Sequence, residues 1–285
     1  MYDRMDFIHR PEGDIKQTGK MKFYPDGSWE LQVASSAIFG GSDWEESNKW
    51  DIKRSKRGQK LTRDLERARR RAAARVRDIA LCTPFRWFVT LTLSPDQIDR
   101  YSISEAVRRM RSWLDNRVRR KGLAYVLVPE LHKDGAVHFH GFFNDADIGI
   151  VDSGTLKLDG AKAPRRPRSE RQRSEWLSAG AKPVYNVGEW SLGFSTAIEL
   201  YGEYDAAIGY CCKYVTKTAD KIGGRWYYSG GDLGAPRVEY CAADYREAVQ
   251  AGAYSFTIEG AGVALAILRG RGNPEDFNEF TVFGK

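Results

Sequence analysis

The stretch Ala124-Tyr-Val-Leu-Val-Pro-Glu-Leu-His-Lys-Asp-Gly-Ala-Val-His-Phe-His-Gly-Phe-Phe143 decides the local fold. Two runs rich in strand-favouring residues, 124–131 and 136–143, flank the loop Lys133-Asp134-Gly135. Three-residue loops with glycine in the left-handed conformation, forming a G1 bulge, commonly join antiparallel strands. The stretch therefore predicts a β-hairpin.

The odd length of this loop decides which side chains share a face. If His132 pairs across the loop with Ala136, Glu130 lies opposite His138. Because side chains alternate along a strand, these three polar residues and His140 then point the same way. A two-residue turn would put Glu130 and His132 on the opposite face.

Two neutral imidazoles and one carboxylate leave coordination positions open for phosphate oxygens or water. Mixed nitrogen and oxygen ligation of this kind accepts Mn²⁺ or Mg²⁺. The hairpin thus predicts a catalytic divalent metal site with His138, His140 and Glu130 as ligands, and His132 as the alternative third ligand. The competing interpretation is that His138 and His140 are structural histidines within an apolar strand.

Further elements flank the hairpin on both sides. Residues 85–93 alternate as a strand does. Ser102 and Glu105 have capping-box spacing, which predicts the start of a helix. A strand pair at 184–187 and 194–200 leads into a helix expected at 205–217.

That last helix carries Tyr210-Cys-Cys-Lys213-Tyr214-Val-Thr-Lys217. At about 100° per residue, the two tyrosines and two lysines fall within one arc of roughly 100°. A free phenol has a pKa of about 10, so nearby ammonium groups or a metal are needed to favour the nucleophilic phenolate. The lysines could also hold a scissile phosphate. The ordinary alternative is a solvated helix face.

Two segments are strongly basic, in a chain of 285 residues with a formal net charge of +7. The first is a predicted helix at 62–80, and the second a predicted long loop at 154–182. Such charge favours a polyanionic partner. The arginines that we expect to contact DNA are Arg67, Arg70, Arg71, Arg165, Arg166 and Arg168.

Several classes are excluded or disfavoured. The four cysteines include no CxxC pair, which fits a reduced cytosolic compartment rather than a disulfide framework or structural zinc. The N-terminus lacks the apolar stretch of a signal peptide, and the longest apolar run is too short to span a bilayer. No Gly-x-x-x-x-Gly-Lys-Ser/Thr stretch is present, which argues against a nucleotide-driven motor. A protein without membrane association is expected.

The motifs Phe88-Val-Thr-Leu-Thr-Leu93, His138-Phe-His140 and Tyr210-x-x-Lys213-Tyr214-x-x-Lys217 resemble those of the HUH endonucleases. The resemblance is to the two-tyrosine rolling-circle replication initiators of small single-stranded DNA phages and plasmids. It covers about residues 85–217. It implies an α+β fold, with helices packed on a central antiparallel sheet, and a bacterial host cytoplasm as location.

The resemblance also implies roles for the site residues. His138, His140 and Glu130 would hold the metal, and Tyr210 and Tyr214 would be alternating nucleophiles assisted by Lys213. Cleavage of single-stranded DNA at a replication origin would leave a 5′-phosphotyrosine and a free 3′-hydroxyl, which would prime a host polymerase alongside a host helicase.

The corresponding domain would span residues 61–220. An N-terminal extension, residues 1–60 with a hairpin at 21–35, and a C-terminal accessory segment, 221–285, would lie outside it.

Relaxases and small transposases would use the same chemistry. Relaxases usually place the tyrosine before the metal motif, and the transposases are shorter and typically carry one tyrosine, so replication initiation is favoured. A different class is a non-catalytic nucleic-acid-binding module, in which Phe139, Tyr210 and Trp226 stack on bases.

Overall fold

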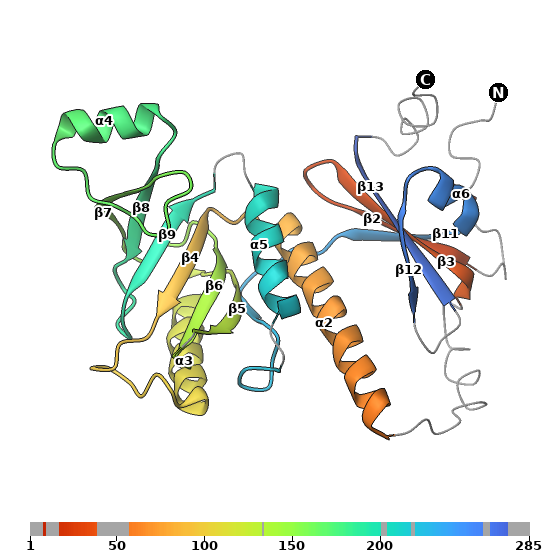
Figure 1. The fold of residues 1–285 in the computed structure, drawn as a ribbon, viewed down its shortest axis with the longest axis horizontal. Helices are drawn as coiled ribbons and strands as arrows, with labels where there is room; N and C mark the ends of the chain where they lie inside the picture. The colour runs from red at the N-terminus through yellow and green to blue at the C-terminus, as the bar shows by residue number, and fades with distance from the viewer. Residues whose placement is uncertain are drawn as a thin grey trace. The chain divides into compact units, whose positions relative to one another are not determined.

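The computed structural model describes residues 8–9, 17–38, 57–132, 134–200, 204–217, 220–258 and 263–272. The chain divides into two compact units, one made of residues 1–65 and 235–285 and the other of residues 66–234 (Figure 1). Each unit has its own open antiparallel sheet with helices. The predicted α+β class is confirmed. No helix in the described ranges is long and apolar enough to cross a membrane.

The unit of residues 66–234 contains a seven-stranded sheet in the order β10-β5-β6-β4-β9-β8-β7. Its neighbouring strands pair antiparallel. The strands are β4 (Trp87–Thr92), β5 (Tyr125–Leu131), β6 (Val137–Phe143), β7 (Ile150–Lys157), β8 (Lys182–Val187), β9 (Ser195–Glu199) and β10 (Tyr228–Gly230). The β5–β6 hairpin therefore lies inside the sheet, with β4 on its other side.

One face of this sheet packs against helix α3 (Ile103–Lys121). Val89 and Leu91 of β4 are fully buried in that core, and the Trp113 ring of α3 stacks on Phe143 of β6 at a centroid distance of 6.4 Å. The predicted helix start is confirmed, because the Ser102 hydroxyl accepts a hydrogen bond from the Glu105 backbone N–H. This apolar face gives the unit its main core.

The opposite face is covered by helix α5 (Tyr204–Lys217). The Tyr204 ring of α5 lies 5.9 Å from that of Phe142, and the Tyr210 ring 5.7 Å from that of Phe88. The apolar side of the helix, as predicted from its spacing, is buried and consists of Ile208, Cys211 and Val215. The polar side is thereby left toward the sheet and solvent.

Helix α2 (Arg57–Cys82) includes the predicted helix at 62–80 and extends it at both ends. It lies beside α5 (Figure 1), since the Cys212 thiol donates to the Ala73 carbonyl at 3.4 Å and the Tyr204 hydroxyl donates to the Ala80 carbonyl. Val76 and Ile79 of its apolar stripe are buried.

The segment 154–182 is not the long loop that we predicted. β7 continues to Lys157, and helix α4 spans Glu170–Ser178. The Ser169 hydroxyl caps α4 by accepting from the Gln172 N–H at 3.2 Å, and an Arg171–Glu175 ion pair follows one turn later. Local capping and charge pairing form this helix, which has no buried residue and therefore no apolar stripe.

The other unit contains a six-stranded sheet in the order β1-β11-β2-β3-β13-β12. Its elements are β1 (Ile8–His9), β2 (Gln17–Phe23), β3 (Ser28–Ile38), β11 (Arg237–Ala243), α6 (Tyr245–Gln250), β12 (Tyr254–Ile258) and β13 (Val263–Arg271). The predicted hairpin at 21–35 is confirmed as β2–β3.

We expected separate N- and C-terminal pieces, but both contribute to this sheet. β2 pairs with β11 and β3 pairs with β13, and Leu31 and Leu268 share one core. Pairing between strands more than two hundred positions apart leaves no local pattern in the sequence. The unit with the seven-stranded sheet accordingly spans 66–234 rather than the expected 61–220.

Candidate active site

The hairpin at the centre of the site has the predicted register. Glu130 pairs with His138, and the His132 N–H donates to the Ala136 carbonyl at 2.8 Å. Gly135 has a φ of 88°, in the left-handed region that favours glycine. The odd-length loop therefore puts Glu130 on the same face as the histidines, although Lys133 itself lies outside the described residues.

Asp134 anchors the loop. Its carboxylate accepts from the Ala136 N–H at 3.0 Å and pairs with Arg100 at 2.6 Å. The same side chain lies 3.2 Å from Nδ1 of His132, which is exposed at the rim of the site. These contacts hold the turn that sets the register of the two strands.

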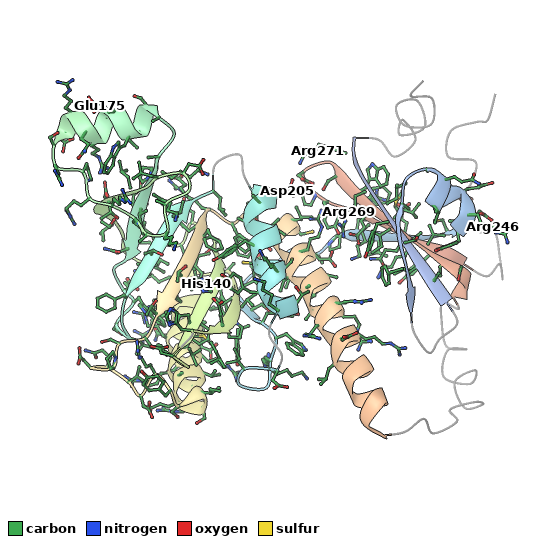
Figure 2. The ribbon with its side chains drawn as sticks, viewed as in Figure 1. His140, Glu175, Asp205, Arg246, Arg269 and Arg271 are labelled. Atoms are coloured by element: carbon green, nitrogen blue, oxygen red, sulfur yellow. The ribbon has the colours of Figure 1, made fainter. Side chains whose placement is uncertain are left out.

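The candidate metal ligands lie in a row across the sheet. Oε2 of Glu130 is 2.9 Å from Nε2 of His140. The His138 ring centroid lies 6.5 Å from that of His140 and 5.1 Å from that of His132. Figure 2 shows His140 on β6, within the sheet. His140 is therefore the member that contacts the carboxylate directly.

Two threonines of β4 complete the row, and sequence analysis gave them no role. Thr90 Oγ1 lies 3.0 Å from Nδ1 of His140, and Thr92 Oγ1 lies 3.2 Å from Nδ1 of His138. A hydroxyl can donate to or accept from a ring nitrogen, so it can hold either tautomer. With Nδ1 protonated, Nε2 would present a lone pair, the arrangement usual for a metal-binding histidine. The alternation of β4 put these threonines on one face, but only the β4–β6 register aligns each with its histidine.

Both tyrosines of α5 lie over this row. The Tyr214 ring stacks on His140 at 5.2 Å, and the Tyr210 ring meets it edge-on at 6.3 Å. The Tyr214 hydroxyl donates to the Tyr210 oxygen at 2.6 Å. Tyr210 is 43% exposed, whereas Tyr214 is half-buried. The candidate nucleophiles and the imidazoles thus share one face of the sheet.

Burial sets the protonation of the site. It lowers the pKa of His140 to about 4, with a further contribution from neighbouring His138. It also lowers the pKa of His138, so both imidazoles are neutral at pH 7. Burial raises the pKa of Glu130, against the opposing charges of His132 and Lys217.

The pKa of Tyr214 is raised, first by burial and then by its hydrogen bond to Tyr210 and the charge of Glu130. Its phenol therefore stays protonated and acts as the donor of the pair. Positive charge brought beside it would act in the opposite direction.

The four predicted α5 residues have different surroundings. Lys213 and Lys217 are both exposed, and Lys217 is close enough to lower the pKa of Glu130. On α2, Arg70 and Arg71 are exposed and Arg67 is half-buried. The neighbouring Arg69 donates to the Thr216 carbonyl at 3.3 Å, which places this basic stretch beside the end of α5.

The other predicted DNA-contacting arginines are exposed in the β7–α4 connection. Arg165 pairs through its backbone with Leu156, and Arg166 donates to the Ser153 carbonyl at 2.8 Å. The Arg168 N–H donates to Gln172. These contacts order the segment locally and do not bring it to the histidine row.

Within the described residues, no group of three His, Cys, Asp or Glu side chains stands ready to hold a metal ion. The donor chemistry nevertheless fits in part. In an octahedral shell with ligands at about 2.1 Å, adjacent donors are about 3 Å apart, close to the 2.9 Å between Glu130 and His140. His138 is the donor that would have to turn toward them.

The base-stacking alternative finds little support in the side chains. Phe139 is fully buried on the α3 face, and Trp226 is also buried. Only Tyr210 of the three proposed stacking residues is exposed. A surface that needs all three aromatic rings is therefore not present.

Fold and site together define an α+β protein with a polar, tyrosine-covered face on an antiparallel sheet. Residues 86–219 match the family model of the replication-associated proteins of the ORF2 and gene II protein type, a stretch that runs from β4 to just beyond α5. The match supports a replication initiator of the Rep type and hence a role with DNA. Comparison with curated proteins gave no match, and comparison with solved structures gave none.

Proposed function

We propose that the protein initiates rolling-circle replication as a metal-dependent endonuclease and strand transferase for single-stranded DNA. The observation that carries the proposal is the stacking of Tyr214 on His140, with Tyr210 hydrogen-bonded beside it. Two candidate nucleophiles thereby lie against the donors that a divalent cation would use. The match to a replication-associated family supports the biological role.

Glu130, His138 and His140 would hold Mn²⁺ or Mg²⁺. When bound, such an ion polarises the scissile phosphate and stabilises the charge of its transition state. A tyrosine oxygen forms a bond to phosphorus while the bond from phosphorus to O3′ breaks. The phenol loses one proton and O3′ gains one, which leaves a 5′-phosphotyrosine and a free 3′-hydroxyl for a host polymerase, once a host helicase opens the duplex.

Tyr210 is the better placed of the two for the first cut. It is more exposed and accepts the hydrogen bond from Tyr214, and such a bond favours the phenolate of the acceptor. Tyr214 would then attack in the next round, while Tyr210 holds the first strand. Lys213 and Lys217, exposed on the same helix, would neutralise phosphate charge.

The test is to incubate the chain with Mn²⁺ and a pool of labelled single-stranded oligonucleotides and to separate the products on a denaturing gel. We expect protein-linked label that a chelator abolishes. The Tyr210→Phe/Tyr214→Phe variant should form none, and Tyr210→Phe should form adduct more slowly than Tyr214→Phe. Adduct formation by the double variant would refute the assignment of the nucleophiles, and tight binding without any adduct would favour a non-catalytic module.

A further inference from the structure

A second basic feature lies on α3, the helix that packs on the face of the sheet opposite to α5. It is a surface pocket of about 650 Å³ between the exposed side of α3 and the turn at 222–225. Neither the histidine row nor the tyrosines contribute to its lining, which includes Arg108, Arg111, Arg119, Asp115, Ser104 and Ser112.

The turn that forms one wall is held in place. The Tyr228 hydroxyl donates to the Ile222 carbonyl at 2.8 Å. Gly223 lies so close to α3 that an added Cβ would come within 2.7 Å of Cγ2 of Val107. The wall therefore stands at a fixed distance from the helix, and the pocket is part of the packed structure.

The lining has an excess of positive charge, with three guanidinium groups against the single carboxylate of Asp115. Arg119 donates through Nε to the Asp115 backbone carbonyl, not to its carboxylate. Across the described part of the chain, Arg108 and Arg111 form no ion pair with an acidic side chain. Exposed arginines of other elements do have such partners, as Arg171 has in Glu175.

The spacing of these arginines suits an extended ligand. Arg108 and Arg111 are neighbours at i and i+3, and Arg119 lies two turns further along the same side of the helix. The row covers eleven residue steps, about 16 Å at 1.5 Å per residue. A B-form strand advances about 3.4 Å per nucleotide, so the row matches about five phosphates and exceeds a single phosphate group.

We propose that this pocket binds the phosphate backbone of a DNA strand, outside the candidate active site. Guanidinium groups bind phosphate oxygens in a bidentate manner, and the serine hydroxyls can donate to the same oxygens. Asp115 weakens the positive potential and limits how deeply a phosphate enters. The protein would thereby hold DNA on both faces of one sheet.

The test measures binding of the full chain to fluorescent single-stranded DNA by anisotropy over a series of salt concentrations, with chelator present so that no strand is cut. We expect the Arg108→Ala/Arg111→Ala/Arg119→Ala variant to bind more weakly. The slope of log affinity against log salt should fall by about 2, since each lost contact removes about 0.7. Unchanged affinity and slope would overturn the proposal.

Two matched variants sharpen the result. Arg120→Ala removes an exposed arginine of the same helix that does not line the pocket, and it should weaken binding less than Arg111→Ala. Asp115→Asn should tighten binding. If the triple variant fails to fold by circular dichroism, Asp115→Asn decides, because unchanged affinity there would refute the proposal.

Two further arms identify the ligand and the independence of the site. Competition by a free mononucleotide at low concentration would show a nucleotide pocket instead of a strand-binding surface and would overturn the proposal. Cleavage of a short oligonucleotide in Mn²⁺ should persist in the triple variant, so loss of backbone binding and loss of catalysis are read separately.

Discussion

The two sheets each carry a cluster of ionisable residues, but the clusters differ in how their charge is balanced. In the six-stranded sheet, Glu30 is 2% exposed and lies between Lys22 on β2, at 3.5 Å, and Arg269 on β13, at 2.7 Å. Both partners are directly cross-strand neighbours of Glu30. This carboxylate already has two cations.

In the seven-stranded sheet, the carboxylate of Glu130 contacts a neutral imidazole, that of His140. His138 beside it is also neutral at pH 7. A cluster that contains its own counter-ions stabilises a fold, whereas donors that need not lose protons to bind a cation are suited to a ligand. The comparison singles out the second cluster as functional, although both are buried, polar and cross-strand.

The largest effect should come from removing a donor of the second cluster. In His140→Ala we expect metal-dependent cleavage to fall more than about 100-fold, beyond the loss typical of residues that only orient a ligand. His132→Ala is the matched control, because His132 is exposed at the rim and contacts Asp134 instead of Glu130. Initial rates of adduct formation measure both. Equal losses in the two variants would remove the distinction between Glu130 and His132 as third ligand.

Breaking the first cluster should affect folding instead. Glu30→Gln should lower the free energy of unfolding by about 3 kcal/mol, the low end for a buried ion pair, since Arg269 reaches water. Glu130→Gln, at a more exposed position, should change it by less than about 1 kcal/mol. Urea unfolding of the two variants measures this. A larger loss in Glu130→Gln would contradict the comparison.

The same variant tests the pH dependence of this contribution. Burial acts to raise the pKa of Glu30, but Arg269 and Lys22 outweigh it and the pKa is lowered. A carboxylate with a lowered folded pKa stabilises the fold above its unfolded pKa, about 4.3, and loses that contribution as pH falls through the folded value. The stability difference between the unchanged chain and Glu30→Gln should therefore shrink on acidification.

The smallest effect should come from the threonines that hold the imidazoles. Thr90→Val keeps the shape but removes the hydroxyl that lies 3.0 Å from Nδ1 of His140, and it should weaken Mn²⁺ binding about tenfold. Thr90→Ser should restore affinity. Calorimetric titration with Mn²⁺ alone checks this without any DNA. Equal affinity in all three chains would mean that Thr90 does not orient the ligand.

Sequence patterns predicted those features that depend on neighbours along the chain. The three-residue loop fixed the register of Glu130 against His138, and helical spacing separated Tyr210 and Tyr214 from the buried side of α5. The same approach missed α4. Its start is marked by Ser169 and Gln172, but a helix without an apolar stripe resembles a basic loop in sequence.

The sequence by itself determined the hairpin, the common face of its polar residues and the reactive side of α5, because loop length and backbone periodicity are local properties. Only the tertiary structure decided that Thr90 lies beside His140, that Tyr214 stacks on that histidine, and that β2 pairs with β11. Those contacts depend on which strands become neighbours. That choice follows from burial of the whole chain, which no local pattern records.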